Sequence, residues 1–259
     1  MATFLFDKIV FGPVTSRRLG VSLGINLLPV DSKLCSFDCI YCECGWTPGR
    51  RNPESMMPSR DLVREKLEEK LISMKSEGTM PDVITFAGNG EPTLHPEFAS
   101  IIDDTIILRD EWAPEARIAV LSNATMLKNK SVFEALLRVE DNIQKLDSAF
   151  EDTIRLLDAP RGRFKLEEVV GQLCRFNGKV TIQTMFVKGS WKGQVVDNST
   201  DREVDAWLKL VGKIGPGQVM IYTIARDTPA ETLQKVSQEE LEKIADKIRM
   251  AGFEVQVSG

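Results

Sequence analysis

The feature that most constrains the fold is a regular alternation of short apolar, β-branched segments with longer amphipathic ones. The pattern predicts strands at 21–28, 82–86, 117–121, 142–146, 180–187, 218–224 and 253–257. Helices are predicted at 59–77, 96–109, 128–139, 165–176, 201–213 and 237–251, several of which begin at Ser, Asp or Thr. Alternating βα units form a parallel sheet covered by helices. Six such units predict an α/β fold that is an incomplete barrel.

The length and composition fit one globular unit. With 259 residues, 42% hydrophobic and 27% charged, the chain has the composition of a soluble protein, and α/β barrels of this length commonly form one domain. We therefore expect a single domain over 1–259, with an N-terminal segment at 1–20. No apolar run approaches the ~20 residues that a membrane span needs. Membrane residence is not expected.

The net charge of −5 gives no overall attraction to a nucleic-acid backbone. Local basic sites remain at Arg17–Arg18, at Arg50–Arg51 and at Arg161 with Arg163. Each of them suits phosphate contacts, but also a solvated face or a structural ion pair.

Three cysteines with the spacing C-x3-C-x2-C occupy one short loop after the first predicted strand. They are Cys35, Cys39 and Cys42, so the loop spans 35–42. A 4Fe-4S cluster normally has four cysteine ligands. Three thiolates on one loop can hold three of its irons, which leaves the fourth iron for a ligand that is not a protein side chain.

Other functions of the cysteines fit the sequence less well. A zinc site formed by these three and Cys44 is less favoured, because such sites usually combine two knuckles from separate parts of the chain. A disulfide framework is disfavoured by the odd count of five cysteines, the length of the chain and the lack of a signal peptide. Cys174 lies in an apolar helical pattern and is predicted to be a buried free thiol. Cys44 is either a spare thiol beside the cluster or a redox participant.

The cysteine motif, with the aromatic Tyr41 before its last cysteine, resembles the signature of the radical S-adenosylmethionine (SAM) superfamily. The segment 11–29 resembles the start of its wyosine-synthetase-like Fe-S oxidoreductase branch. The segment 86–96 resembles the superfamily's Gly-Gly-Glu-Pro segment, although Asn89 stands where the first glycine is usual. The second half of the chain matches only in its strand and helix rhythm.

The resemblance implies a radical SAM core, a (β/α)6 partial barrel with the cluster loop after the first strand. It implies a 4Fe-4S cluster and S-adenosylmethionine as cofactors, with Cys35, Cys39 and Cys42 as cluster ligands. Tyr41 would lie near adenine, and the loop of Asn89, Gly90 and Glu91 would bind the methionyl amino group. The implied chemistry is reductive cleavage of SAM to a 5′-deoxyadenosyl radical that abstracts a substrate hydrogen. It calls for an electron donor such as flavodoxin or ferredoxin, and for a reducing compartment, the cytoplasm.

Barrel enzymes place their active sites at the carboxyl ends of the strands. Ser122 and Asn123 follow the third predicted strand and suit either a ribose or carboxylate contact or a plain helix cap. In the fifth strand, Gln183 or Thr184 faces the cofactor or is a structural polar residue. Arg226, near the end of the sixth strand, suits an anionic substrate group or the cofactor carboxylate.

Three further residues carry weaker expectations. Lys145 and Asp147 lie at the end of the fourth predicted strand, and an inward charge there needs either a protein partner or a ligand. The lone histidine, His95, is expected to cap or pack rather than to catalyse. No residue is assigned as the catalytic acid or base.

Three classes of function fit this pattern. The first is a radical enzyme acting on a nucleic-acid base, with tRNA as a candidate partner. The second is a radical enzyme acting on a protein or small molecule, including a glycyl-radical activating enzyme. A non-enzymatic zinc or Fe-S binding module, supported by the cysteines alone, is the third and the least favoured.

Overall fold

The computed structural model describes residues 4–16, 18–49, 57–226 and 228–259. Two of the basic positions noted above, Arg17 and the pair Arg50–Arg51, lie outside the described residues. The strands of the larger sheet are β1 Val10–Ser16, β2 Gly20–Ile25, β3 Val83–Phe86, β4 Arg117–Ser122, β5 Asp141–Lys145, β6 Thr181–Met185, β9 Gln218–Tyr222 and β11 Val255–Ser258. A smaller sheet consists of β7 Val187–Trp191, β8 Gln194–Asp197 and β10 Leu233–Lys235.

The helices lie mostly between consecutive strands of the larger sheet. They are α1 Arg60–Glu77, α2 Phe98–Trp112, α3 Lys130–Leu136, α4 Glu151–Leu157, α5 Leu166–Cys174, α6 Asp201–Ile214, α7 Gln238–Met250 and the short 3-10 helix η2 Pro92–Leu94. None of the helices in the described part of the chain combines the length and apolar character needed to cross a membrane.

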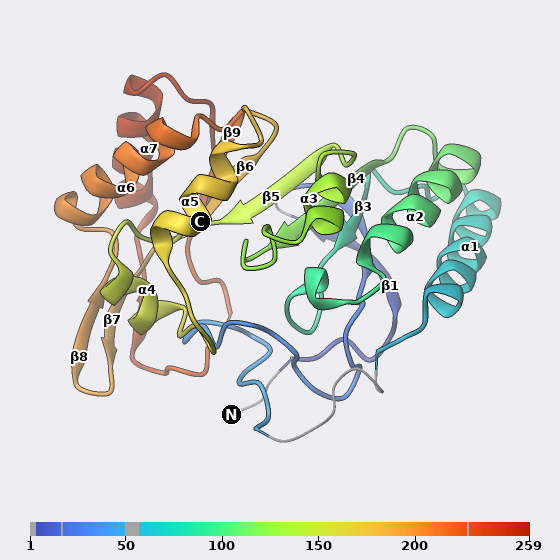
Figure 1. Cartoon of the computed structure of the whole chain (residues 1–259), viewed down its shortest axis with the longest axis horizontal. Coiled ribbons are helices and arrows are strands. Elements are labelled where there is room, and N and C mark those ends of the chain that lie inside the picture. Colours follow the sequence, from blue (N-terminus) through green and yellow to red (C-terminus); the bar gives the residue numbers. More distant parts are fainter. Residues whose placement is uncertain (1–3, 17, 50–56, 227) are drawn as a thin grey trace.

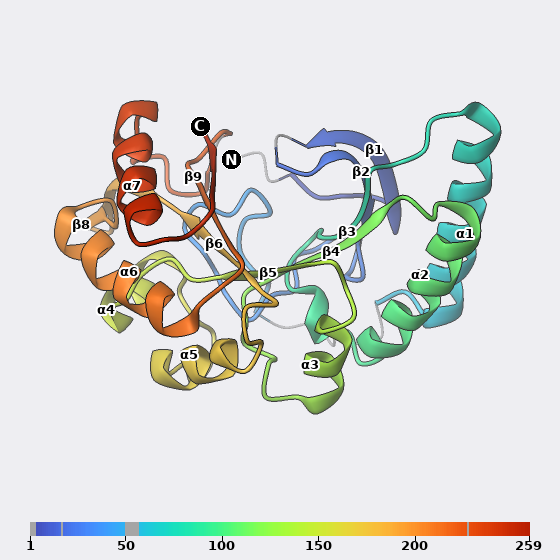
Figure 2. The same cartoon turned by 90° about the horizontal axis from the view of Figure 1, so that it is seen from above.

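The larger sheet has the order β1-β2-β3-β4-β5-β6-β9-β11. From β2 to β11 all neighbouring strands are parallel, and only β1 is antiparallel, to β2. The sheet curls into a half-barrel. Figure 2 shows the strands as an arc, with the helices outside it. In Figure 1, α1 to α3 cover one half of the sheet, and α5 to α7 cover the other half. The predicted α/β partial barrel is confirmed.

Alternate residues of each strand face opposite sides of the sheet. The outward residues, such as Ile84, Phe86 and Ile118, belong to the large buried cluster packed under the helices. The inward side has a much smaller apolar cluster that includes Val83 and Ala119. The concave side of the half-barrel therefore has room for polar residues.

Several helix ends follow local sequence rules. Ser59 caps α1 by accepting a hydrogen bond from the Leu62 N–H, and Gly78 ends the helix in the left-handed conformation. At the start of α7, Ser237 and Glu240 form a capping box.

The sequence did not predict three parts of the fold. Strand β1 was missed because Gly12–Pro13 interrupts it, and its pairing with β2 is irregular between Phe11 and Val14. Helix α4 has seven residues and no side-chain cap, so it leaves little periodic signal. The predicted strand 180–187 covers the whole of β6 and the first residue of β7, which belongs to the smaller sheet.

Asn198 forms hydrogen bonds with the segment in which the chain passes from the larger sheet to the smaller one. Its side-chain oxygen accepts the Val187 N–H, and its amide donates to the carbonyls of Met185 and Asp147. The continuous apolar run therefore divides into β6 and β7. The hairpin of β7 and β8, together with β10, then forms the smaller antiparallel sheet.

Candidate active site

The loop that contains the three cysteines begins at Leu34, which is held by two backbone hydrogen bonds. We call this pair of bonds the clamp at Leu34. Leu34 donates its N–H to the Asn89 carbonyl at 2.8 Å, and its own carbonyl accepts the Glu91 N–H at 3.1 Å. Gly90 has a φ of 140°, and a Cβ at this position would lie 1.8 Å from the Leu34 carbonyl oxygen. The close approach of the two loops therefore requires glycine at position 90.

The opposite side of the cysteine loop is held by the segment after α4. The Asp38 N–H donates to the Asp158 carbonyl at 3.0 Å, and the Ile40 N–H donates to the Leu157 carbonyl at 2.9 Å. The Arg161 N–H donates in turn to the Ser36 carbonyl. All of these contacts use backbone atoms, so the path of the loop is fixed by its main chain.

All five cysteines are free thiols, which excludes the disulfide alternative. Cys39 is buried, and Cys35 and Cys42 are partly buried. The thiols of Cys35, Cys39 and Cys42 act electrostatically on one another. Within the described ranges, however, no group of three or more His, Cys, Asp or Glu side chains is arranged so that it could hold a metal ion. The donor set is present on one loop, while the side chains do not point to one centre.

The thiols differ in acidity because their surroundings differ. A hydrogen bond with the Cys44 thiol outweighs burial and lowers the pKa of Cys42 to about 6. Burial, together with the nearby Glu91, raises the pKa of Cys35 to about 12. Burial also raises the pKa of Cys39. The thiol of Cys44 additionally lies 3.6 Å from the Gly88 carbonyl oxygen, so this cysteine lies between the cysteine loop and the loop 88–91.

A buried lysine lies beside the cysteines. The side chain of Lys33 is 1% exposed, and its Nζ donates to the Gly45 carbonyl at 2.8 Å and lies 3.6 Å from an Asp38 oxygen. Burial works against its charge, but charge interactions with the three cysteines and with Asp38 outweigh it and raise the pKa of Lys33. The ammonium group therefore stays charged next to the cysteine loop.

Glu91 joins the loop 88–91 to the loop that follows β4. Its buried carboxylate accepts the N–H and hydroxyl of Thr93 on one oxygen, and the Asn123 N–H at 2.6 Å on the other. Burial raises the pKa of Glu91, although these hydrogen bonds oppose the shift. Asn123 then reaches the cysteine loop, because its amide donates to the Ser36 hydroxyl at 2.8 Å and lies 3.6 Å from the Cys35 Sγ.

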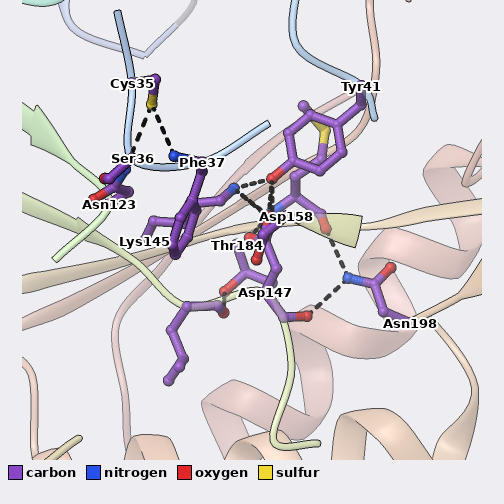
Figure 3. A network of polar contacts seen from close by, with 12 residues as sticks. Cys35, Ser36, Phe37, Tyr41, Asn123, Lys145, Asp147, Asp158, Thr184 and Asn198 are labelled. Atoms are coloured by element: carbon purple, nitrogen blue, oxygen red, sulfur yellow. Dashed lines mark hydrogen bonds and ion pairs between the residues drawn. The ribbon is translucent and has the colours of Figure 1, made fainter. Parts of the chain in front are cut away.

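Tyr41 contacts a buried network of charged side chains, which we call the ionic network (Figure 3). Its hydroxyl contacts Lys145 and the carboxylates of Asp147 and Asp158. The Lys145 Nζ lies 2.5 Å from Asp147 and 3.4 Å from Asp158, and these carboxylate side chains are 0% and 2% exposed. One oxygen of Asp147 also accepts the Met185 N–H. Lys145 has protein partners, the first of the two arrangements expected for an inward charge.

Burial and neighbouring charges shift the pKa values of Lys145 and Asp158 in this network. Burial opposes the Lys145 ammonium, but Asp147 and Asp158 outweigh it, and the pKa of Lys145 lies well above its usual range. Burial raises the pKa of Asp158 to about 7, although Lys145 opposes this shift. The network faces a small cavity that is also lined by Phe37, Asn123, Leu146, Ile154, Phe164 and Val169. The cavity thus lies between the carboxyl end of β5 and the cysteine loop.

Strained backbone marks both edges of this site. Ala124 follows β4 with a φ of 66°, and Ala159 follows α4 with a φ of 41°. Residues other than glycine rarely adopt such angles, and they tend to cluster at functional sites.

The remaining predicted site residues are dispersed. Asn89 uses its side-chain amide on the Phe6 backbone and on the Pro29 carbonyl, so it ties the N-terminal segment to the loop 88–91. Arg226 is exposed and pairs with Glu43 at 2.6 Å. Gln183 lies opposite Lys145 in the register of β5 and β6.

Three other polar or thiol side chains have structural partners. Thr184 donates its hydroxyl to the Leu146 carbonyl. The buried His95 accepts the Glu97 N–H and contacts the Pro58 carbonyl, in keeping with its expected capping role. Cys174, predicted to be buried, is only half-buried because it is the last residue of α5, where its thiol contacts the Lys213 carbonyl.

Sequence reasoning missed two residues of this site. Lys33 gave no signal, because its burial depends on how the loop folds around it. Asp158 was missed for a similar reason, since it meets Tyr41 across 117 positions of the chain. The only hint was an acidic residue directly after a short helix.

The sequence matches the Radical SAM superfamily over residues 30–190, which is more than half of the chain. This chain belongs to the radical SAM superfamily. It is therefore an enzyme of a superfamily whose radical chemistry depends on cleavage of SAM, and the superfamily expected from the motifs is confirmed.

Curated relatives of this radical SAM protein cover most of its length. It is 32% identical over 243 residues to a protein named GTPase Obg from Brachyspira hyodysenteriae, covering 92% of this chain and 33% of that protein. It is 28% identical to a UPF0026 protein of Methanocaldococcus jannaschii, covering 91% of this chain and 70% of the relative. The chain thus spans about a third of the first relative.

Solved structures share the radical SAM fold. A radical SAM methyltransferase from Sphaerobacter thermophilus has a TM-score of 0.67 at 16% identity, covering 92% of this chain and 65% of that one. Archaeal TYW1 has a TM-score of 0.51 at 13% identity, covering 89% of this chain and 72% of that one. At such low identities the likeness shows a common fold.

Radical SAM membership implies SAM and, typically, a 4Fe-4S cluster. The residues of this chain fit that cluster in their chemistry. Three thiols share one loop whose backbone is held from two sides, and their charges interact. Thiolates are the usual ligands of such clusters.

Proposed function

We propose that this protein binds a 4Fe-4S cluster through Cys35, Cys39 and Cys42 and cleaves SAM reductively, in order to remove a hydrogen atom from a substrate. The observation that carries the proposal is the clamp at Leu34, which joins the cysteine loop to the loop 88–91. This clamp joins the loop of the three cysteines to the segment that resembles the methionine-binding motif. The whole chain, 1–259, acts as one unit in this proposal.

The loops around the cluster provide the SAM site. We assign the methionyl amino group to the loop of Asn89, Gly90 and Glu91, and the ribose to Ser122 and Asn123. The Glu91 carboxylate accepts hydrogen bonds from both loops, so it sets their relative position. Asn89 acts at this site indirectly, by holding the N-terminal segment against the loop.

The side chains of the ionic network line one side of the proposed site. A cluster held by Cys35, Cys39 and Cys42 would supply the electron for reductive cleavage of SAM to methionine and a 5′-deoxyadenosyl radical, the species that would take the hydrogen atom. Lys145 and Asp147 fix the Tyr41 hydroxyl, and thereby the ring next to the last cysteine ligand. Since their side chains are largely buried, they help to keep water from the site.

The remaining assignments follow from position. Gln183 lies beside Lys145 in the sheet and is assigned to the cofactor side of β6. Arg226, beside Glu43 of the cysteine loop, is assigned to an exposed rim, where it can meet a carboxylate or an anionic substrate group. A reductant such as flavodoxin or ferredoxin would deliver the electron, and we place the protein in the cytoplasm, where this reducing chemistry is sustained.

Anaerobic reconstitution with iron and sulfide tests the proposal. The protein should gain iron, sulfide and broad visible absorption, and after reduction it should convert SAM to 5′-deoxyadenosine. The substitution Cys39→Ala should abolish both results, while Cys174→Ala should leave them intact because Cys174 lies at the end of α5, away from the loop. Failure of the wild-type protein to take up iron and sulfide would refute the proposal. So would a stable zinc site that includes Cys44.

A further inference from the structure

A second, more open pocket lies next to the cavity of the ionic network. We name it the basic groove, because three of its lining residues are the cations Lys128, Arg163 and Lys165. Its other lining residues are Ala124, Thr125, Phe164, Glu168, Val169 and Gln172. The groove thus lies between the loop after β4 and the first turns of α5.

The charge of the basic groove is positive. Glu168 is the one carboxylate among its lining residues, and it contacts both Lys128 and Arg163. Lys128 and Arg163 are nevertheless 62% and 75% exposed, so their remaining donors are accessible from solvent. Three cations against one carboxylate contrast with the net charge of −5 of the whole chain. The groove is therefore a local patch of positive charge.

The position of the groove connects it to the candidate active site. Phe164 and Val169 line both the basic groove and the cavity that contains Lys145 and Asp147. Phe164 also packs edge-on against Phe37 of the cysteine loop, with ring centroids 5.7 Å apart. The cavity itself has a volume of only about 10 Å³, about that of one water molecule, so a ligand in the basic groove would lie beside Phe164 rather than enter the cavity.

We propose that the basic groove binds a phosphate group of the substrate, with the reacting part of the same molecule directed along Phe164 toward the cysteine loop. This inference rests on the proposed function, and it narrows the substrate class to phosphate esters. Arginine can contact phosphate oxygens in a bidentate way, and lysine supplies a compact positive charge. The phosphate would compete with Glu168 for these donors.

Calorimetric titration of the reconstituted protein with inorganic pyrophosphate tests the site. The double variant Lys128→Gln/Arg163→Gln should weaken binding about tenfold, because two of the three charge-assisted contacts are lost. The variant Glu168→Gln should strengthen binding about threefold, because it removes the competing carboxylate. A gain in affinity cannot come from partial unfolding, so this variant separates an electrostatic role from damage to the fold.

A control variant removes one positive charge outside the groove. Lys243 on α7 is 70% exposed and pairs with Glu239, so Lys243→Gln resembles the Lys128 change without touching the groove. It should leave the affinity for pyrophosphate unchanged. The proposal is overturned if pyrophosphate does not bind, if Lys243→Gln weakens binding as much as the double variant, or if Glu168→Gln has no effect.

Two sources of the phosphate group are distinguished by competition. A short single-stranded RNA that displaces pyrophosphate, with an affinity that falls as salt rises, assigns the groove to a polynucleotide backbone. Displacement by adenosine monophosphate but not by RNA assigns it to a free phosphate ester. Cleavage of SAM by the wild-type protein is measured separately. Cleavage without pyrophosphate binding overturns the groove alone, whereas a lack of cleavage overturns the proposed function.

Discussion

Replacing Gly90 with alanine should separate the two loops of the site. The added Cβ would lie 1.8 Å from the Leu34 carbonyl oxygen, and φ is 140°. The obstacle is backbone on both sides, so no side-chain rotation can relieve it. We expect the hydrogen bonds from Leu34 to Asn89 and from Glu91 to Leu34 to break, at about 1 kcal/mol each. Backbone strain adds about 1–3 kcal/mol, which makes a total of about 3–5 kcal/mol.

Urea unfolding followed by circular dichroism measures this loss, and iron uptake reports the state of the cysteine loop. A matched glycine in helix α6, Gly212, has nothing within 4 Å of its added Cβ. Gly212→Ala should therefore stabilise the protein by about 1 kcal/mol, because alanine is the better helix former. If Gly90→Ala unfolds at the wild-type urea concentration and takes up iron normally, the clamp does not hold the loop in the way described.

Two further substitutions test the ionic network and the link between α7 and the smaller sheet. Asp147→Asn should destabilise the protein by about 3–5 kcal/mol because Lys145 loses its closest carboxylate. The double variant with Lys145→Met should lose less than the single variant, and an additive double-mutant cycle would contradict the coupling. The ion pair with Lys188 lowers the pKa of Glu240 to about 2. A lowered folded-state pKa stabilises the protein above the unfolded value of about 4.5, and the benefit is lost as pH falls toward 2. The stability difference between wild type and Glu240→Gln should shrink over this range in urea unfolding, and a constant difference would contradict the assignment.

Much of the larger sheet was predictable, because its inner strands are short runs of β-branched and apolar residues bounded by polar ones. Strands β3 and β9 lie close to the predicted positions for this reason. The edges were harder to predict. Strand β1 contains a proline and is mostly exposed, so burial leaves no alternating pattern in it. The smaller sheet depends on where Asn198 turns the chain, which is a tertiary contact.

The candidate site, like the fold, could be predicted from the sequence only in part. Its cysteines and the loop 88–91 stand in compact motifs that the sequence displays directly. The partners of Tyr41 do not, because Lys145, Asp147 and Asp158 are more than a hundred positions away from it. Asn89 shows the opposite case, since it stands inside a motif while its side chain is used on the N-terminal segment. Local patterns identified which loops matter, whereas long-range packing decided what their side chains contact.

The way the cysteine loop is anchored bears on how such enzymes can diversify. Between its first and second cysteines the loop is held through main-chain groups of Ser36 and Asp38. Substitutions at these positions would leave these main-chain bonds in place and would remove side-chain contacts such as those of Ser36 with Asn123 and of Asp38 with Lys33 and Arg161. Directed evolution could therefore vary the polarity around the cofactor, and with it the reactivity, while the scaffold keeps its shape.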